Sequence, residues 1–229
     1  NKEEKLIKSY RKEAAELYKN IHTYFAREVE GYDTYRYYDG NTVLRSWICI
    51  PLTMGIYDQA EGTIAALFSD KLWMENGLLT QSGTSTYWDR STLYAFRGSY
   101  ACGARDIATK YLEQYSTTRL LGDHVPYAVE AWPEGNQRHL STESALYCRI
   151  MTEGLFGIRP IALNAFTLTP QLPKSWNEMA IRRVCAFGKI YDIEVKRDKG
   201  EHLLVFIKED NKTVRKYKVD NGKSVEVRF

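Results

Sequence analysis

The chain has no long uninterrupted apolar run. No stretch reaches the roughly 18 apolar residues that a membrane-spanning helix needs, and no signal peptide opens the sequence. We therefore expect no membrane partner, while the compartment stays open, with a periplasmic or secreted location slightly favoured. The chain begins at Asn1 without methionine and enters a helical pattern directly, so we expect that its natural N-terminus has been removed.

Metal-ligand spacing is also missing. The cysteines are Cys49, Cys102, Cys148 and Cys185, and the histidines are His22, His124, His139 and His202. Three cysteines lie in strongly apolar runs, which predicts buried free thiols and no disulfide framework. The histidines are scattered, and no loop has the spacing of calcium ligands. We expect no metal and no cofactor.

No run of one charge sign dominates the sequence. The 32 basic and 29 acidic residues leave a formal charge of only +3, and the basic residues are spread among acids, which argues against a nucleic-acid partner. The aromatic content is rich, with 17 tyrosines and five tryptophans. Aromatic faces commonly line sugar-binding clefts, although they also fill cores.

Apolar periodicity predicts helices in the first part of the chain. They cover residues 5–29, 43–56, 59–72, 91–115 and 141–157. The first has one polar face, whereas 43–56 is apolar almost all round and 141–157 should be mostly buried. Pro51 should kink 43–56 or limit it to short pieces. Helices of both kinds together are what a two-layer ring of helices requires.

After Pro160 the pattern changes to a period of two. Strands are predicted over residues 179–184, 190–196, 203–208, 214–219 and 225–229. Lys199-Gly200 and Asn221-Gly222 supply hairpin turns. The order predicts an α+β chain, with a helical domain over 1–160 and an antiparallel β domain over 161–229.

The long loop expected over 121–138 contains the sequence YAVEAWPEG. It carries two carboxylates, Glu130 and Glu134, on either side of Trp132. Loops on a rigid scaffold often carry catalytic groups, and glycoside hydrolysis uses a pair of carboxyl groups. The alternative is that both glutamates are surface charges.

This loop and the sequences that follow it resemble a known family. The segments are STESALYCRIMTEGLFGIRP (141–160) and FTLTPQLPKSW (166–176). They are similar to the end of the catalytic barrel in six-hairpin glycosidases, which include glucoamylases, glycogen-debranching glucosidases, processing α-glucosidases and cellobiose phosphorylase. The resemblance implies the C-terminal part of an α/α six-hairpin barrel, followed by a small antiparallel β domain.

The resemblance also implies roles. Glu130 matches the general base of the inverting hydrolases, with Glu134 as the second choice, and the general acid would lie upstream of this chain. About five of twelve barrel helices are present. At Glu143 the sequence departs from the family, which often has tryptophan there.

A second motif, TYWDRSTLYAFRG (86–98), resembles the family's sugar subsite. The resemblance implies that Trp88 stacks on a sugar ring and that Asp89 and Arg97 bind hydroxyls; Trp132 is a further candidate for substrate binding. The alternatives are a core position for Trp88, a helix N-cap for Asp89 and a structural ion pair for Arg97.

The leading hypothesis is an inverting glycoside hydrolase. Its partners would be a carbohydrate substrate and the N-terminal remainder of the same enzyme. One alternative is a glycoside phosphorylase, which needs phosphate-binding donors in place of a base. Another is a non-catalytic carbohydrate-binding or structural fragment, whose first helices would leave apolar faces uncovered.

Overall fold

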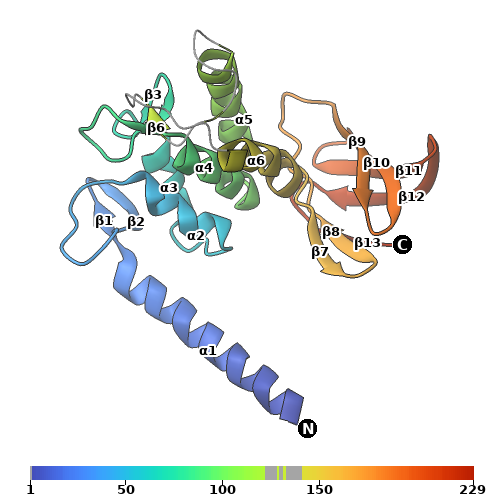
Figure 1. Cartoon of the computed structure of the whole chain (residues 1–229), viewed down its shortest axis with the longest axis horizontal. Coiled ribbons are helices and arrows are strands. Elements are labelled where there is room, and N and C mark those ends of the chain that lie inside the picture. The colour runs from blue at the N-terminus through green and yellow to red at the C-terminus, as the bar shows by residue number, and fades with distance from the viewer. Residues whose placement is uncertain (1, 122–127, 129–130, 133–140) are drawn as a thin grey trace.

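A computed structural model describes residues 2–121, 128, 131–132 and 141–229, and it confirms a mixed chain of helices followed by antiparallel strands (Figure 1). The helices are α1 (Lys2–Phe25), η1 (Ser46–Cys49), α2 (Ile50–Thr53), α3 (Ala60–Leu67), α4 (Asp89–Ala101), α5 (Arg105–Gln114), η2 (Tyr115–Leu120), α6 (Ser141–Arg149) and η3 (Ile150–Leu155). The strands are β1 (Ala26–Val29), β2 (Tyr32–Tyr35), β3 (Trp73–Met74), β4 (Gly77–Leu78), β5 (Tyr87–Trp88), β6 (Ala131–Trp132), β7 (Arg159–Ala162), β8 (Ala165–Leu168), β9 (Glu178–Ala186), β10 (Lys189–Arg197), β11 (His202–Glu209), β12 (Lys212–Asp220) and β13 (Val225–Arg228).

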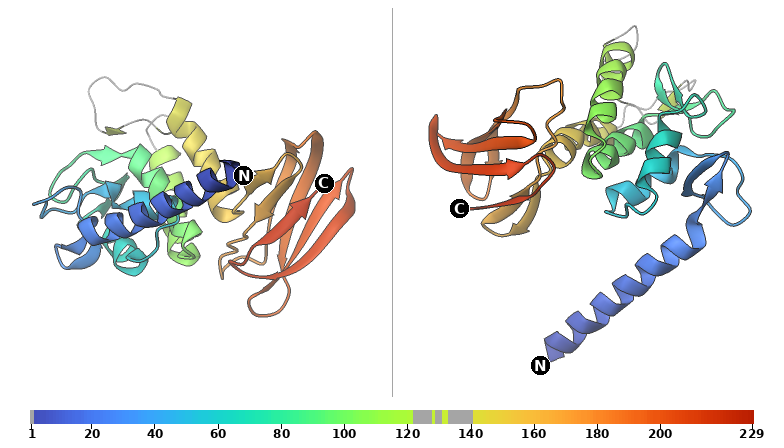
Figure 2. Two further views of the ribbon diagram at one scale, coloured as in Figure 1. Left: turned by 90° about the horizontal axis from the view of Figure 1, so that it is seen from below. Right: turned by 180° about the vertical axis from the view of Figure 1, so that it is seen from behind.

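Helix α1 projects away from the remaining helices (Figure 1 and Figure 2). The amphipathic helix predicted over 5–29 is present, although its last residues form strand β1. None of the residues of α1 is buried. Its large apolar side chains are at least two-fifths exposed at Leu6, Ile7, Tyr10, Leu17, Tyr18 and Tyr24. Helix α1 therefore has an apolar stripe that no described residue covers.

The segment predicted as a buried helix over 43–56 is divided into two short pieces, η1 and α2. Pro51 lies in the first turn of α2, where its missing N–H costs no helical hydrogen bond. Ile48, Cys49 and Leu52 are buried. The prediction that Pro51 limits this segment to short pieces is therefore confirmed.

Helix α4 lies at the centre of the helical part. Ten of its residues are buried, and it packs against α2, α6 and η3. Gly98 permits the first contact, because an added Cβ would lie 2.7 Å from the Cβ of Leu52. The prediction of a single helix over 91–115 is wrong, because this range contains two helices, α4 and α5. Gly103 adopts φ +91°, a left-handed conformation that ends α4 and lets α5 start in a new direction.

Aromatic rings fill the core behind α4. Phe68 stacks on Tyr111 with ring centroids 4.7 Å apart, and Trp73 meets Phe96 edge to face at 5.6 Å. Tyr115 lies against Phe96 at 5.9 Å. Such pairs each add about 0.5–1.5 kcal/mol beyond the burial of their area. This cluster fixes the helix that carries several of the candidate site residues.

The helix predicted over 141–157 is present as α6, which continues into the π-helical turn η3. All four cysteines are free thiols, as expected. Their burial was predicted correctly only in part, because Cys148 and Cys185 are exposed. Cys148 lies two positions from the buried Leu146 and so points to the opposite side of α6. Cys185 lies on β9, an edge strand.

The C-terminal strands form two antiparallel sheets. The five predicted strands are present as β9 to β13, while β7 and β8 were not predicted. One sheet has the order β12-β11-β10-β9 and the other β13-β8-β7. The hairpin predicted at Asn221-Gly222 is wrong, because β13 pairs with β8 and crosses to the other sheet. The boundary expected at 160/161 falls within β7.

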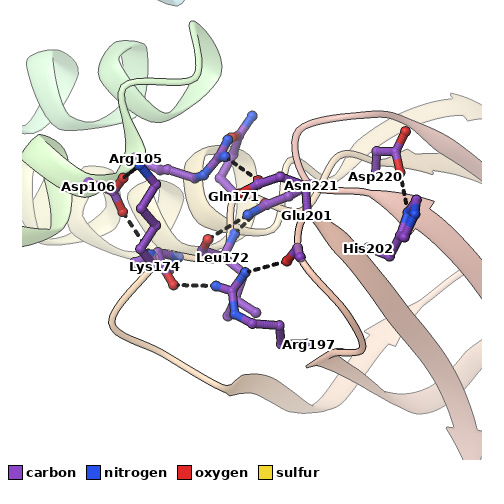
Figure 3. A network of polar contacts seen from close by, with 12 residues as sticks. Arg105, Asp106, Gln171, Leu172, Lys174, Arg197, Glu201, His202, Asp220 and Asn221 are labelled. Atoms are coloured by element: carbon purple, nitrogen blue, oxygen red, sulfur yellow. Dashed lines mark hydrogen bonds and ion pairs between the residues drawn. The ribbon is translucent and has the colours of Figure 1, made fainter.

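A network of polar contacts joins α5 to the β-sheets (Figure 3). Arg105 donates to the Glu201 carboxylate at 2.7 Å, and Asp106 accepts from the Lys174 backbone N–H at 2.8 Å. Asn221 bonds both backbone groups of Leu172, at 2.7 and 2.9 Å. The segment after β8 is thus held on both sides.

Candidate functional site

The two motifs singled out in the sequence lie side by side. Strand β5 pairs with β6 so that Tyr87 opposes Trp132 and Trp88 opposes Ala131. The structure describes the backbone pairing of Trp132, whereas its side chain lies outside the described part. Glu130 and Glu134 lie outside the described residues. We call the loop over 121–138, which carries these two glutamates, the acidic loop. Its residues 131–132 pair with the strand that immediately precedes α4.

Three aromatic rings lie at this junction. Trp88 meets Trp47 edge to face, with ring centroids 5.1 Å apart, and Trp47 lies 6.2 Å from Tyr94. All three side chains are half-buried, which means that part of each ring can face a ligand. Trp47 is contributed by η1. The sequence reasoning missed it because it lies within an apolar run that predicts only a buried helix.

Charged groups of α4, α6 and η3 continue the line of contacts. The Arg97 guanidinium lies 5.6 Å from the Tyr94 ring centroid and 3.4 Å from the Glu153 carboxylate. Arg149 also donates to Glu153, at 2.9 Å from Nη2. We call the six residues Trp47, Trp88, Tyr94, Arg97, Arg149 and Glu153 the aromatic–charged face. Glu153 lies within the motif at 141–160, but the sequence pattern did not predict its role as the shared acceptor.

Burial sets the electrostatics of this face. Burial lowers the pKa of Arg97, with Arg149 and Arg159 adding to the effect and Glu153 opposing it. The hydrogen bond to Glu153 raises the pKa of Arg149. The ion pair considered as an alternative for Arg97 is therefore present. Because guanidinium groups bind carboxylates and hydroxyls in fixed directions, the same pair can also orient a polar ligand.

Asp89 pairs with Arg119 and with none of the six residues of the aromatic–charged face in the contacts described. It is fully buried, and its carboxylate accepts a hydrogen bond from Arg119 at 2.9 Å. Asp89 is the first residue of α4, and Trp88 precedes the helix without a side-chain cap, so Asp89 is not the N-cap. Its role in binding sugar stays a prediction. In this structure it fixes the start of α4, next to Trp88.

Arg90, the next residue of α4, pairs with a carboxylate of α6. Its Nε donates to the Glu143 carboxylate at 2.7 Å, and Glu143 is fully buried. Glu143 lies in the first turn of α6, where the helix dipole favours a negative charge. Residues 89 and 90 thus tie α4 to η2 and to α6.

An apolar cavity of about 470 Å³ adjoins this face at the base of α1. Its walls include Ile21, Phe25, Trp47, Pro51 and Met54. Met54 is 71% exposed. The cavity continues the uncovered stripe of α1.

Within the ranges described here, no three histidine, cysteine, aspartate or glutamate side chains gather as metal ligands would. Among the same residues, no helix combines the length and the apolar character that crossing a membrane requires. The chain was compared with protein-family models, with curated proteins and with solved structures, and none of the three comparisons found a match.

Proposed function

We propose that this chain is the C-terminal part of a six-hairpin α/α barrel and that it processes glycosidic bonds. The observation that carries the proposal is the pairing of β5 with β6, which joins the acidic loop to the aromatic–charged face. Rings such as those of Trp47 and Trp88 present apolar surfaces to the C–H face of a pyranose. Arg97 and Glu153 then offer a donor and an acceptor for hydroxyl groups.

In this proposal the reaction is hydrolysis with inversion. Glu130 takes a proton from water, the water oxygen attacks the anomeric carbon, and a carboxylic acid outside this chain protonates the leaving oxygen. The two carboxyl groups of such enzymes lie roughly 6.5–9.5 Å apart, which leaves room for the water. Glu134 is the second candidate for the base. The buried Asp89 would act as a positioning residue for Trp88.

The apolar stripe of α1 and the neighbouring cavity form a surface that another part of the enzyme could cover. Both are apolar and uncovered in the described structure, and large uncovered apolar surfaces mark interaction sites. We infer that helices from the N-terminal remainder of the enzyme cover them and complete the barrel. A non-catalytic fragment would expose the same surfaces, so a measurement of glycosidic cleavage distinguishes it from the proposed enzyme.

A phosphorylase is the second candidate. Two arginines, Arg97 and Arg149, share the single carboxylate of Glu153, and arginine binds phosphate well. The experiment that tests both is a screen of oligosaccharides with and without phosphate, followed by NMR of the first anomer released, on the natural polypeptide that carries this sequence. Cleavage in water with inversion supports the hydrolase. Cleavage that needs phosphate supports the phosphorylase, and cleavage in neither condition contradicts both.

A further inference from the structure

A second, polar pocket lies where the helical part meets the β-sheets. Its volume is about 230 Å³. Its polar atoms are contributed by segments far apart in the sequence, at Tyr57, Glu153, Arg159, Thr169, Gln171 and Ser224. Pockets for drug-sized ligands measure about 300–1,000 Å³. This pocket therefore suits a smaller molecule, of about the size of one sugar ring.

Gly157 in the pocket wall has no room for a side chain. Gly157 adopts φ +61°, and an added Cβ would lie 2.4 Å from the carbonyl oxygen of Thr169. The Thr169 and Ser224 hydroxyls lie 2.7 Å apart, and the Gln171 backbone N–H donates to the Leu155 carbonyl at 2.8 Å. The walls are thus held in place by hydrogen bonds within the chain.

Gln171 provides a donor with no use in the described structure. Residue Gln171 is 3% exposed, and its Oε1 accepts a hydrogen bond from Arg105 at 3.5 Å (Figure 3). The amide nitrogen donates to none of the residues that the structure describes. Gln171 lines the pocket, so this donor is available to a ligand that enters it.

The charges around the pocket favour an anion. Glu153 is the only carboxylate among the described residues that line it, and it is already paired with Arg97 and Arg149. Arg159 makes no side-chain hydrogen bond or ion pair with a described residue. Arg159 lines the pocket, whereas Arg97 and Arg149 lie behind it on Glu153, so these three guanidinium groups outnumber the single carboxylate by two charges. An anionic ligand would balance part of this excess.

We propose that this pocket binds a small hydroxylated anion, namely a monosaccharide with a carboxylate or a phosphate group. Arg159 pairs with the anionic group, while Gln171 and the hydroxyls of Thr169 and Ser224 bind the sugar hydroxyls. The pocket shares Glu153 with the aromatic–charged face, but binding of this anion does not depend on the proposed hydrolase activity. Glu153 contacts both, so occupancy of the pocket has a direct route to Arg97.

Isothermal titration of the chain with four probes tests the proposal: glucuronate, glucose 6-phosphate, glucose and inorganic phosphate. We expect one or both sugar anions to bind at least about tenfold more tightly than glucose and inorganic phosphate, because only the sugar anions combine a charged group for Arg159 with hydroxyl groups for the other polar side chains. Comparison of the two sugar anions identifies the source of the charge. Equal binding of glucose, equal binding of inorganic phosphate, or no binding of either sugar anion overturns the proposal.

Variants at exposed positions make the test specific. Arg159→Gln should weaken binding of the preferred anion about tenfold, and Ser224→Ala should weaken it by a smaller factor. Arg228→Gln on β13 is the matched control and should leave binding unchanged, because Arg228 lies outside the pocket and pairs with Glu226. All three residues are exposed, so the variants should fold. Unchanged binding by Arg159→Gln contradicts the assignment.

Discussion

Asp89 and Arg119 form an ion pair that is buried on both sides, with 2.9 Å between Oδ2 and Nη2. The pair connects the first residue of α4 to η2. Burial raises the pKa of the neighbouring Tyr115 well above its ordinary value, and the negative charge of Asp89 raises it further. The interior next to Trp88 is therefore a region of low polarity in which an unpaired charge is costly.

Breaking this pair should destabilise the fold. Arg119→Met leaves Asp89 without this partner and should lower the free energy of unfolding by about 3–5 kcal/mol, measured by urea denaturation. The control is Glu16→Gln, which removes an exposed pair with Lys12 and should change stability by less than about 0.5 kcal/mol. A loss below about 1 kcal/mol for Arg119→Met would show that the pair is not needed to hold α4.

Trp88 should contribute to ligand binding more than to stability. Trp88→Ala removes a half-buried ring from the aromatic–charged face and should weaken oligosaccharide binding about tenfold or more, measured by isothermal titration. Trp176→Ala serves as the matched control, because Trp176 is 39% exposed and lies outside that face. If Trp88→Ala lowers only the melting temperature, Trp88 is a core residue.

The stability of the larger β-sheet should decrease in acid. The hydrogen bond from Lys208 lowers the pKa of Glu194, and Arg182 assists. A carboxylate with a lowered pKa stabilises the fold at pH values above its unfolded pKa, about 4.3 for glutamate, and this stability is lost as pH falls through the folded pKa. Urea denaturation at pH 7 and pH 3 should show the loss, and Glu194→Gln should reduce the difference. An unchanged difference would exclude Glu194 as a cause.

Helix α1 should contribute little to the stability of this chain alone. Leu17 is 60% exposed and Leu52 is fully buried. Leu17→Ala should therefore change the free energy of unfolding by less than about 0.5 kcal/mol, whereas Leu52→Ala should cost about 2–5 kcal/mol. In the natural polypeptide, Leu17→Ala should become clearly destabilising. The same small effect in both contexts would contradict the covering of α1 by further helices.

Local patterns in the sequence predicted most of the elements. Apolar periodicity identified α1, α3 and α6, and alternation identified β9 to β13. These local patterns failed where the structure depends on contacts between residues far apart in the sequence. The pairing of β13 with β8 joins segments more than 50 residues apart, and the break at Gly103 interrupts an otherwise continuous helical pattern.

The site was predicted only in part for the same reason. The two motifs around Trp88 and Ala131 were both identified, but their pairing could not be, because no local pattern encodes contact between a loop and a distant strand. Trp47 and Glu153 were missed, since each lies in a segment whose apolar neighbours indicate only a core. Burial of the Asp89 and Arg119 charges likewise depends on packing of the whole helical part.

Turnover of Glu130→Gln in the natural polypeptide tests the central claim most directly. The variant keeps the size of the side chain but cannot accept a proton from water, so we expect the rate of glycosidic cleavage to fall about 10²-fold or more. Melting temperature should stay the same, and Glu134→Gln should have a much smaller effect. Unchanged turnover in Glu130→Gln would contradict the assignment of the general base and the proposed hydrolase mechanism.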